Sequence, residues 1–108
     1  MADPLQTVIE TEIYLRSAER LMTEPERAAV VDFFAADSSA GDVIPGTGGL
    51  RKVRVPLAGR GKRGGARVIT CFVHARGVYL LLAYAKNEQA NLTPAQAQTL
   101  ARLVGTLF

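Results

Sequence analysis

The spacing of apolar residues along the chain predicts three helices. Residues 12–22 carry apolar side chains at helical spacing, namely Ile13, Tyr14, Ala18, Leu21 and Met22. A second helix should start after Thr23 and run to about Ala36, because Pro25 suits a first turn and Glu26 completes a capping box. We expect it to bury Ala29, Val30, Phe33 and Phe34. A third follows the capping sequence Thr93-Pro94-Ala95-Gln96, and its apolar stripe comprises Ala97, Leu100, Ala101, Val104, Leu107 and Phe108.

Short apolar and β-branched runs predict four strands, at residues 6–11, 50–57, 67–75 and 78–86. The last two are apolar on both faces, which is typical of central strands. Arg76-Gly77 should form the tight turn between them. The order β-α-α-β-β-β-α predicts an α+β fold, with a largely antiparallel four-stranded sheet in one domain over residues 1–108.

Charge is distributed unevenly along the chain. Residues 1–42 hold nine acidic side chains against three arginines, whereas residues 43–87 hold nine Lys or Arg and no acid. Seven of the thirteen basic residues lie between Gly41 and Arg67, on a glycine-rich segment. Because like charges without counter-charges repel one another, this block predicts an anionic partner, with nucleic acid as the first candidate.

Other features narrow the possible classes of function. The longest uncharged apolar run, Val78 to Ala85, is too short to cross a bilayer. Without a signal-peptide pattern, and with Cys71 as its single cysteine, the chain is expected in the cytoplasm. Cys71 and His74 should point to opposite faces of a strand, so neither a metal site nor a cofactor is expected. The glycines do not match a phosphate-binding loop and are expected to serve turns through positive φ.

Pairing of the last two strands predicts a cationic site. With the turn centred on Arg76, Arg67 would lie opposite Ala85 or Lys86, close to Tyr84. The preceding strand would bring Arg54, and with it Lys52, to the same sheet. Directly opposed cations destabilise a sheet, so such a cluster calls for a bound anion.

Clustered cations suit phosphoryl transfer, because they stabilise the extra charge of a pentavalent phosphate. RNA supplies its own nucleophile, the 2′-hydroxyl, so an endoribonuclease of this kind needs no metal. Lys86 or Tyr84 could carry the proton, with a pKa lowered by neighbouring cations. The alternative interpretation makes Tyr84 a core residue and Lys86 a solvated strand end.

The segments GDVIPGTGGLRKVR, GKRGGARVI, YLLLAYAKNE and LTPAQ together resemble RelE/HigB toxins of type II toxin–antitoxin modules. The resemblance spans almost the whole chain, and the first block with GGAR is its most specific part. It implies a RelE-like, microbial ribonuclease-type α+β fold with a four-stranded sheet. It also implies entry into the ribosomal A site, cleavage of mRNA during translation, and neutralisation by a cognate antitoxin, often with a helix-turn-helix domain of the HigA kind.

The same resemblance implies roles for individual residues. Arg67 would stabilise the phosphate transition state, Lys52 and Arg54 would orient the substrate, and Lys86 and Tyr84 are the candidates for proton transfer. RNA contacts would come from the basic residues around them: Arg51, Lys52, Arg60, Lys62 and Arg63. The sequence departs from many relatives at Thr70-Cys71, where aromatic residues are common, and in having no tyrosine after Tyr84.

Two other functions remain open at this point. A related ParE-type toxin shares the fold but poisons DNA gyrase, and a basic module could bind nucleic acid without cleaving it. The antitoxin could cover the basic site, or it could bind the acidic N-terminal helices and leave that site open.

Overall fold

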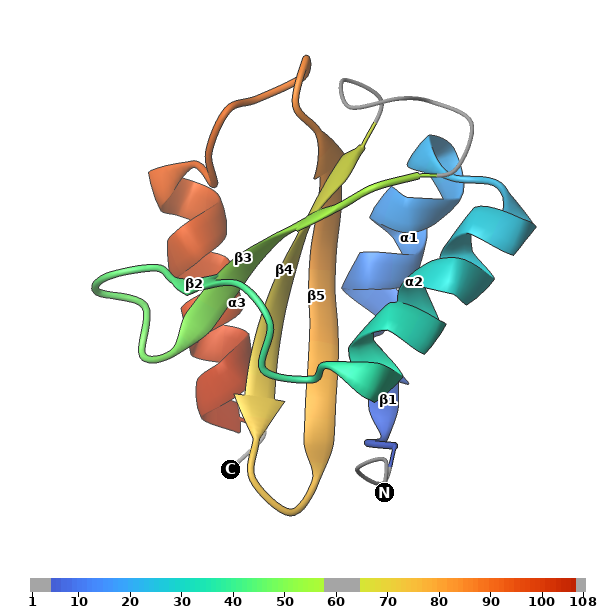
Figure 1. The fold of residues 1–108 in the computed structure, drawn as a ribbon. Helices are drawn as coiled ribbons and strands as arrows, with labels where there is room; N and C mark the ends of the chain where they lie inside the picture. The colour runs from blue at the N-terminus through green and yellow to red at the C-terminus, as the bar shows by residue number, and fades with distance from the viewer. Residues whose placement is uncertain (1–4, 58–64, 107–108) are drawn as a thin grey trace.

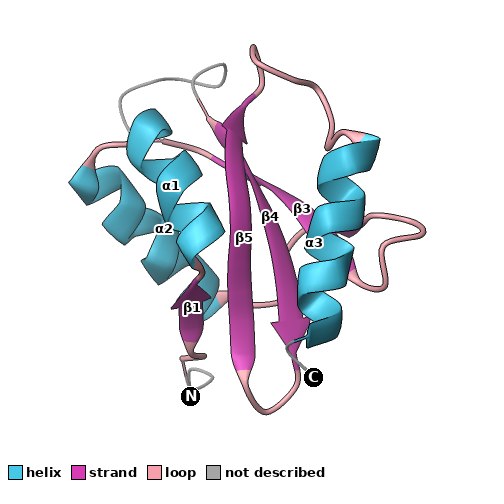
Figure 2. Ribbon diagram, turned by 180° about the vertical axis from the view of Figure 1, so that it is seen from behind, coloured by secondary structure: helices cyan, strands magenta, loops and turns pink. Residues whose placement is uncertain are grey.

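The computed structural model describes residues 5–57 and 65–106, and it forms one mixed sheet flanked by helices. The strand order across the sheet is β1-β5-β4-β3-β2, with β1 parallel to β5 and the other neighbours antiparallel. Helices α1 and α2 lie on one side of strands β4 and β5, and α3 lies on the other (Figures 1 and 2). The elements are β1 (Val8–Glu10), α1 (Glu12–Leu21), α2 (Glu24–Ala36), β2 (Asp42–Val43), β3 (Leu50–Val55), β4 (Ala66–Val73), β5 (Gly77–Ala85) and α3 (Pro94–Thr106).

The predicted α+β class is confirmed, with one correction to the sheet. Among the described residues it has five strands rather than four, because Asp42 and Val43, for which no strand was predicted, pair with Lys52 and Arg51. Two residues are too few to give a periodic pattern in the sequence. No helix in the described ranges is long and apolar enough to span a bilayer.

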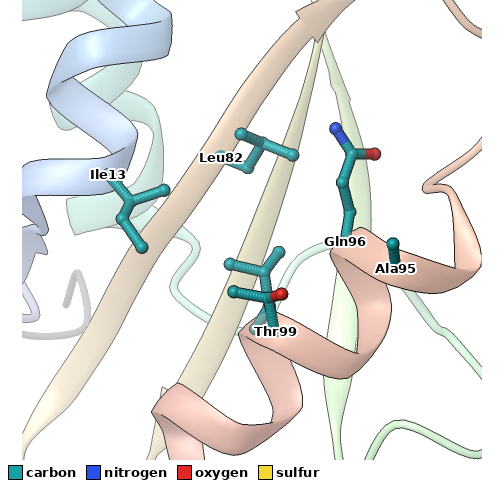
Figure 3. A pocket seen from close by; sticks show the side chains of 6 residues that line it. Ile13, Leu82, Ala95, Gln96 and Thr99 are labelled. Carbon is teal, nitrogen blue, oxygen red and sulfur yellow. The ribbon is translucent and has the colours of Figure 1, made fainter.

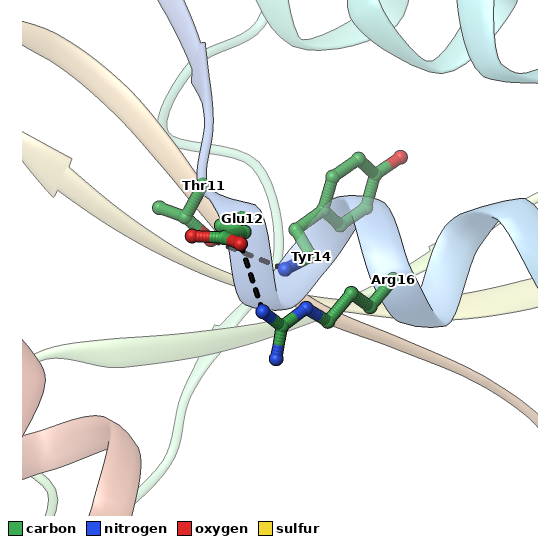
Figure 4. Close-up of polar contacts among 4 residues, drawn as sticks. All are labelled: Thr11, Glu12, Tyr14 and Arg16. Atoms are coloured by element: carbon green, nitrogen blue, oxygen red, sulfur yellow. Dashed lines mark hydrogen bonds and ion pairs between the residues drawn. The ribbon is translucent and has the colours of Figure 1, made fainter.

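Local hydrogen bonds fix the starts of all three helices. The Thr11 hydroxyl accepts from the Tyr14 backbone N–H at the start of α1, where Arg16 also donates to the Glu12 carboxylate at 2.8 Å (Figure 4). The predicted capping box of Thr23 and Glu26 is present at α2. In α3 the Thr93 hydroxyl accepts from Gln96 N–H, and the Gln96 side chain accepts from Thr93 N–H.

The two faces of the sheet carry separate apolar clusters. Strand residues such as Val53, Val68 and Ala83 pack with the side chains of α1 and α2, including Tyr14 and Phe34. On the other face the strands pack against α3 through Leu50, Ile69, Cys71, Leu81, Tyr84, Leu100 and Val104. The prediction for α2 is wrong at one position, since Ala29 is exposed while Val30 and Phe34 are buried.

The turn between β4 and β5 differs from the prediction. It centres on Ala75, which adopts a φ of 70°, and Val73 pairs with Gly77. Gly77 itself has a φ of 124°, and a Cβ there would collide with the carbonyl oxygen of Thr7. The predicted turn centre at Arg76 is therefore wrong by one residue. The alternation of apolar and polar residues does not indicate that Ala75 adopts a left-handed backbone conformation.

A β-bulge in β5 decides which side chains face α3. Thr70 pairs with Leu80 and Ile69 pairs with Leu82, so Leu81 is the extra residue. After one extra residue, the following side chains change face. The bulge therefore turns Tyr84 towards the α3 side, whereas uninterrupted alternation from Leu80 would turn it towards α1.

Ser17 of α1 forms a hydrogen bond with β5 just beyond this bulge. Its hydroxyl accepts a hydrogen bond from the Ala83 N–H at 2.9 Å and donates to the Tyr14 carbonyl. Strand β1 pairs with β5 only as far as Leu80, so among the described residues this edge of β5 has no further strand partner there. Ser17 thus satisfies a backbone donor that β1 does not reach.

Candidate nucleic-acid interface

A row of three candidate side chains, here called the cationic row, crosses β3, β4 and β5 near one end of these strands and on the α3 side. Arg54 of β3 is the direct partner of Arg67 in β4, and Arg67 is the direct partner of Tyr84 in β5. Arg54 and Arg67 alternate with the buried residues Val53, Val55, Ala66 and Val68, which face α1 and α2, so both guanidinium groups belong to the opposite face. Side chains at such paired positions start about 5 Å apart. The sequence prediction had placed Ala85 or Lys86 opposite Arg67, and the turn centre and the bulge together account for that error.

Tyr84 is the buried end of this row. It is 4% exposed, and its hydroxyl has no hydrogen-bond partner among the described residues. Burial raises the pKa of the Tyr84 phenol, and the nearby Arg67 guanidinium partly opposes that rise. The phenol therefore keeps its proton at neutral pH, next to a half-buried cation.

Lys52 extends the cationic surface along β3. It precedes Arg54 by two residues, so both side chains lie on the same face. Its ammonium group donates to the Asn91 side-chain oxygen at 2.9 Å, across the loop between β5 and α3. Lys52 and Asn91 also line a pocket of about 340 Å³, together with Asp42, Val43, Ile44, Pro45 and Leu92.

A comparison with protein families matches residues 35–108 to the family described as "RelE toxin of RelE / RelB toxin-antitoxin system". The chain belongs to the RelE toxin family. It is therefore a toxin that pairs with an antitoxin. The matched range runs from the last turn of α2 to the end of the chain, and it includes every residue of the cationic row.

The other predicted site residues are not gathered into the row. Lys86 is exposed after the end of β5, and no described contact joins it to Arg67 or Tyr84. Arg51 faces away from the toxin's cationic row, and it donates to the Gly41 carbonyl at 3.1 Å. Arg60, Lys62 and Arg63 lie outside the described residues.

The glycines before β3 shape the loop that borders this surface. Gly41, Gly46, Gly48 and Gly49 all have positive φ, as predicted for turn residues. Within the loop, the Thr47 hydroxyl donates to the Ile44 carbonyl at 2.6 Å and accepts from the Leu50 N–H. These hydrogen bonds within the loop stabilise it, and two of its residues, Ile44 and Pro45, line the pocket.

Two further hollows lie away from the row. An apolar pocket of about 220 Å³ sits between α1 and α3 over β5, lined by Ile13, Leu82, Ala95, Gln96, Thr99 and Leu100 (Figure 3). A groove on α1 and α2 is lined by Glu10, Glu19 and Glu24 with Arg27. The acidic part of the sequence thus forms a surface of its own on the helical side of the toxin.

Sequence reasoning missed two pocket residues, Asp42 and Asn91. Asp42 lies outside every predicted helix and strand, and Asn91 lies 39 positions from the lysine that it contacts. A search for polar residues flanking the cationic strands could have flagged both positions. Only the pairing of β2 with β3 and the path of the loop before α3 bring them together.

Proposed function

We propose that this toxin is a metal-independent endoribonuclease that cleaves mRNA on the ribosome during translation. The opposed pair Arg54–Arg67 carries this proposal. Like charges directly opposite each other destabilise a sheet, and a bound phosphate would relieve that repulsion. Arginine also presents a planar fork of donors that matches phosphate oxygens.

In the proposed reaction, the 2′-oxygen of one nucleotide attacks the adjacent phosphorus. A bond forms between the 2′-oxygen and phosphorus while the bond from phosphorus to the 5′-oxygen breaks. The products are a 2′,3′-cyclic phosphate and a free 5′-hydroxyl. Arg67 and Arg54 stabilise the negative charge that gathers on the non-bridging oxygens, while Lys52 positions the neighbouring backbone.

Proton transfer needs a donor for the departing 5′-oxygen and an acceptor for the 2′-hydroxyl proton. The Tyr84 phenol keeps its proton at neutral pH because burial raises its pKa, so it suits the role of donor. Lys86 is the second candidate for proton transfer, and solvent water accepts the 2′-hydroxyl proton where no side chain of the toxin does. Arg60, Lys62 and Arg63 remain proposed RNA contacts, and the antitoxin is proposed to be a helix-turn-helix protein of the HigA kind that acts in the same cytoplasm.

The test is to induce the toxin in bacterial cells, map the 5′ ends of mRNA, and assay DNA breaks in the same samples. We expect new 5′-hydroxyl ends inside translated reading frames, and their loss when ribosomes are kept off the message. Intact mRNA with gyrase-linked DNA breaks would show a ParE-like toxin instead. Salt-sensitive RNA binding without new ends would show a binding module.

A further inference from the structure

The pocket beside the cationic row has the chemistry of a nucleobase site. Its walls are apolar, formed by Val43, Ile44, Pro45 and Leu92, and its polar groups are Asp42, Lys52 and Asn91. A volume of about 340 Å³ is within the range of small-molecule sites, about 300–1,000 Å³. Apolar walls accept the flat faces of a base, and a few fixed polar groups can select its edge.

Asp42 and Lys52 form the selective edge of this pocket. They are direct partners across β2 and β3, so their side chains start side by side on one face. Lys52 uses one of its three ammonium hydrogens on Asn91, which orients the group and leaves two to donate. Within the described ranges, no hydrogen bond or ion pair engages the Asp42 carboxylate. Two acceptor oxygens from Asp42 and a donor group from Lys52 therefore line the same pocket.

We infer that this pocket binds one guanine base of the RNA substrate and gives the toxin a sequence preference. Guanine offers two adjacent donors, at N1 and N2, which match the two oxygens of Asp42. The guanine O6 acceptor, on the same edge, matches the ammonium group of Lys52. Cytosine, uracil and adenine each lack the pair of adjacent donors that the Asp42 carboxylate could accept.

The position of the pocket supports a nucleotide next to the scissile phosphate. Lys52 and Arg54 are two residues apart on β3, which is about 7 Å along a strand. A phosphate held at Arg54 and Arg67 would thus leave the base of a neighbouring nucleotide within reach of Pro45 and Leu92. This inference rests on the proposed function for its biological meaning, but the binding of guanine can be measured without cleavage.

The first test uses the full chain and four nucleoside monophosphates, followed by NMR of the Asn91 side-chain amide. We expect guanosine monophosphate to shift this resonance saturably, with at least about fivefold higher affinity than the other three. The nearly isosteric variant Asp42→Asn presents one acceptor and one donor, a pair that all four bases can match, so guanine should lose its advantage over the other three. The control Asp32→Asn removes the same charge from the exposed face of α2 and should keep the guanine preference.

The second test maps mRNA ends after induction of the wild type, Asp42→Asn and Asp32→Asn. We expect guanine at one fixed position beside the wild-type cut, and a loss of that preference only in Asp42→Asn. Equal binding of all four monophosphates, or cutting by Asp42→Asn with the wild-type preference, would overturn the inference. So would a loss of antitoxin binding in Asp42→Asn with unchanged base preference, since the pocket would then be a protein-docking site. If the wild type cuts no mRNA, the proposed function fails, while the titration still decides whether the pocket binds guanine.

Discussion

The two faces of the sheet bury similar apolar clusters but differ in how far their helices cover them. On one face α1 and α2 pack over Val53, Val68 and Ala83, and the acidic side chains lie outside on the helices. On the other face α3 packs over Leu50 and Ile69 in a cluster that includes Tyr84, while Arg54 and Arg67 lie beside this cluster and are not part of it. The first face is a closed core, and the second combines a core with a cationic surface set on rigid strands.

Two buried tyrosines, one on each face of the sheet, allow the faces to be compared through the pKa of a single hydroxyl group. Tyr14 on the helical face and Tyr84 on the α3 face both have hydroxyls without a partner in the described part of the chain. Burial raises the pKa of Tyr14 to about 12; the nearby Glu10 carboxylate adds to the rise, and the Arg27 guanidinium partly opposes it. For Tyr84 the nearby charge is Arg67, which acts to lower the pKa. A phenolate is therefore disfavoured on both faces, but a carboxylate adds to the penalty only at Tyr14.

The largest effect is expected from Arg67 itself. Arg67→Ala should lower the rate of mRNA cleavage on programmed ribosomes about 10²–10³-fold, as removal of one transition-state donor does in other enzymes. Arg67→Lys should recover only part of the rate, since lysine keeps the charge but not the planar fork. Arg20→Ala, an exposed arginine on α1, serves as the matched control and should cleave at the wild-type rate. Normal cleavage by Arg67→Ala would remove Arg67 from the reaction.

Tyr14 should make the toxin sensitive to alkaline pH. Its pKa is about 12 in the fold against 10 when unfolded, so the protonated phenol stabilises the fold fully below pH 10. That stabilisation is lost as pH rises from 10 to 12, by about 2–3 kcal/mol in the free energy of unfolding.

Denaturant unfolding of the wild type and Tyr14→Phe across this pH range checks the prediction. The variant should lose less stability, because it has no phenol to ionise. Tyr84→Phe should show a smaller difference from the wild type, because Arg67 favours the Tyr84 phenolate. An equal alkaline loss in the wild type and Tyr14→Phe would contradict the assignment.

Ser17 tests how α1 supports the bulged strand that carries Tyr84. Ser17→Ala leaves the buried Ala83 N–H without its acceptor and should lower the free energy of unfolding by about 1–3 kcal/mol. The control is Ser39→Ala in the exposed turn after α2, which should change stability little. Urea unfolding of both variants measures the difference, and equal midpoints would mean that another group accepts from Ala83.

The smallest predicted effect has the opposite sign. Arg54→Ala removes the cation directly opposite Arg67, so it should raise the free energy of unfolding by about 0.2–1 kcal/mol while lowering cleavage. The gain should shrink at high salt, which screens exposed charges. Thermal unfolding at two salt concentrations tests this, and a loss of stability at low salt would show that the pair is not repulsive.

Much of the fold was predictable because it depends on local signals. The capping boxes at Thr23 and Thr93 and the apolar runs of β4 and β5 all lie in short stretches of sequence. The cationic row was predicted only in part: Arg54, Arg67 and Tyr84 lie together as predicted, but Tyr84 takes the place opposite Arg67 that was predicted for Ala85 or Lys86.

The remaining features depend on contacts between distant segments. The bulge at Leu81 leaves no mark in the run VYLLLAYA, because apolar residues on both faces hide a change of register. The strand next to the bulge is instead bound by a distant element, because the Ala83 N–H donates a hydrogen bond to Ser17 in α1. The pocket likewise joins Asp42 and Asn91, which no local pattern links.

The most direct test is a structure of the toxin on a ribosome whose mRNA carries a methylated 2′-oxygen at the cleavage site. That substrate binds but has no nucleophile, so the complex stops before reaction. We predict that the scissile phosphate lies within about 3 Å of guanidinium nitrogens from both Arg54 and Arg67. A phosphate bound on any other surface, with these two arginines facing solvent, would contradict the account.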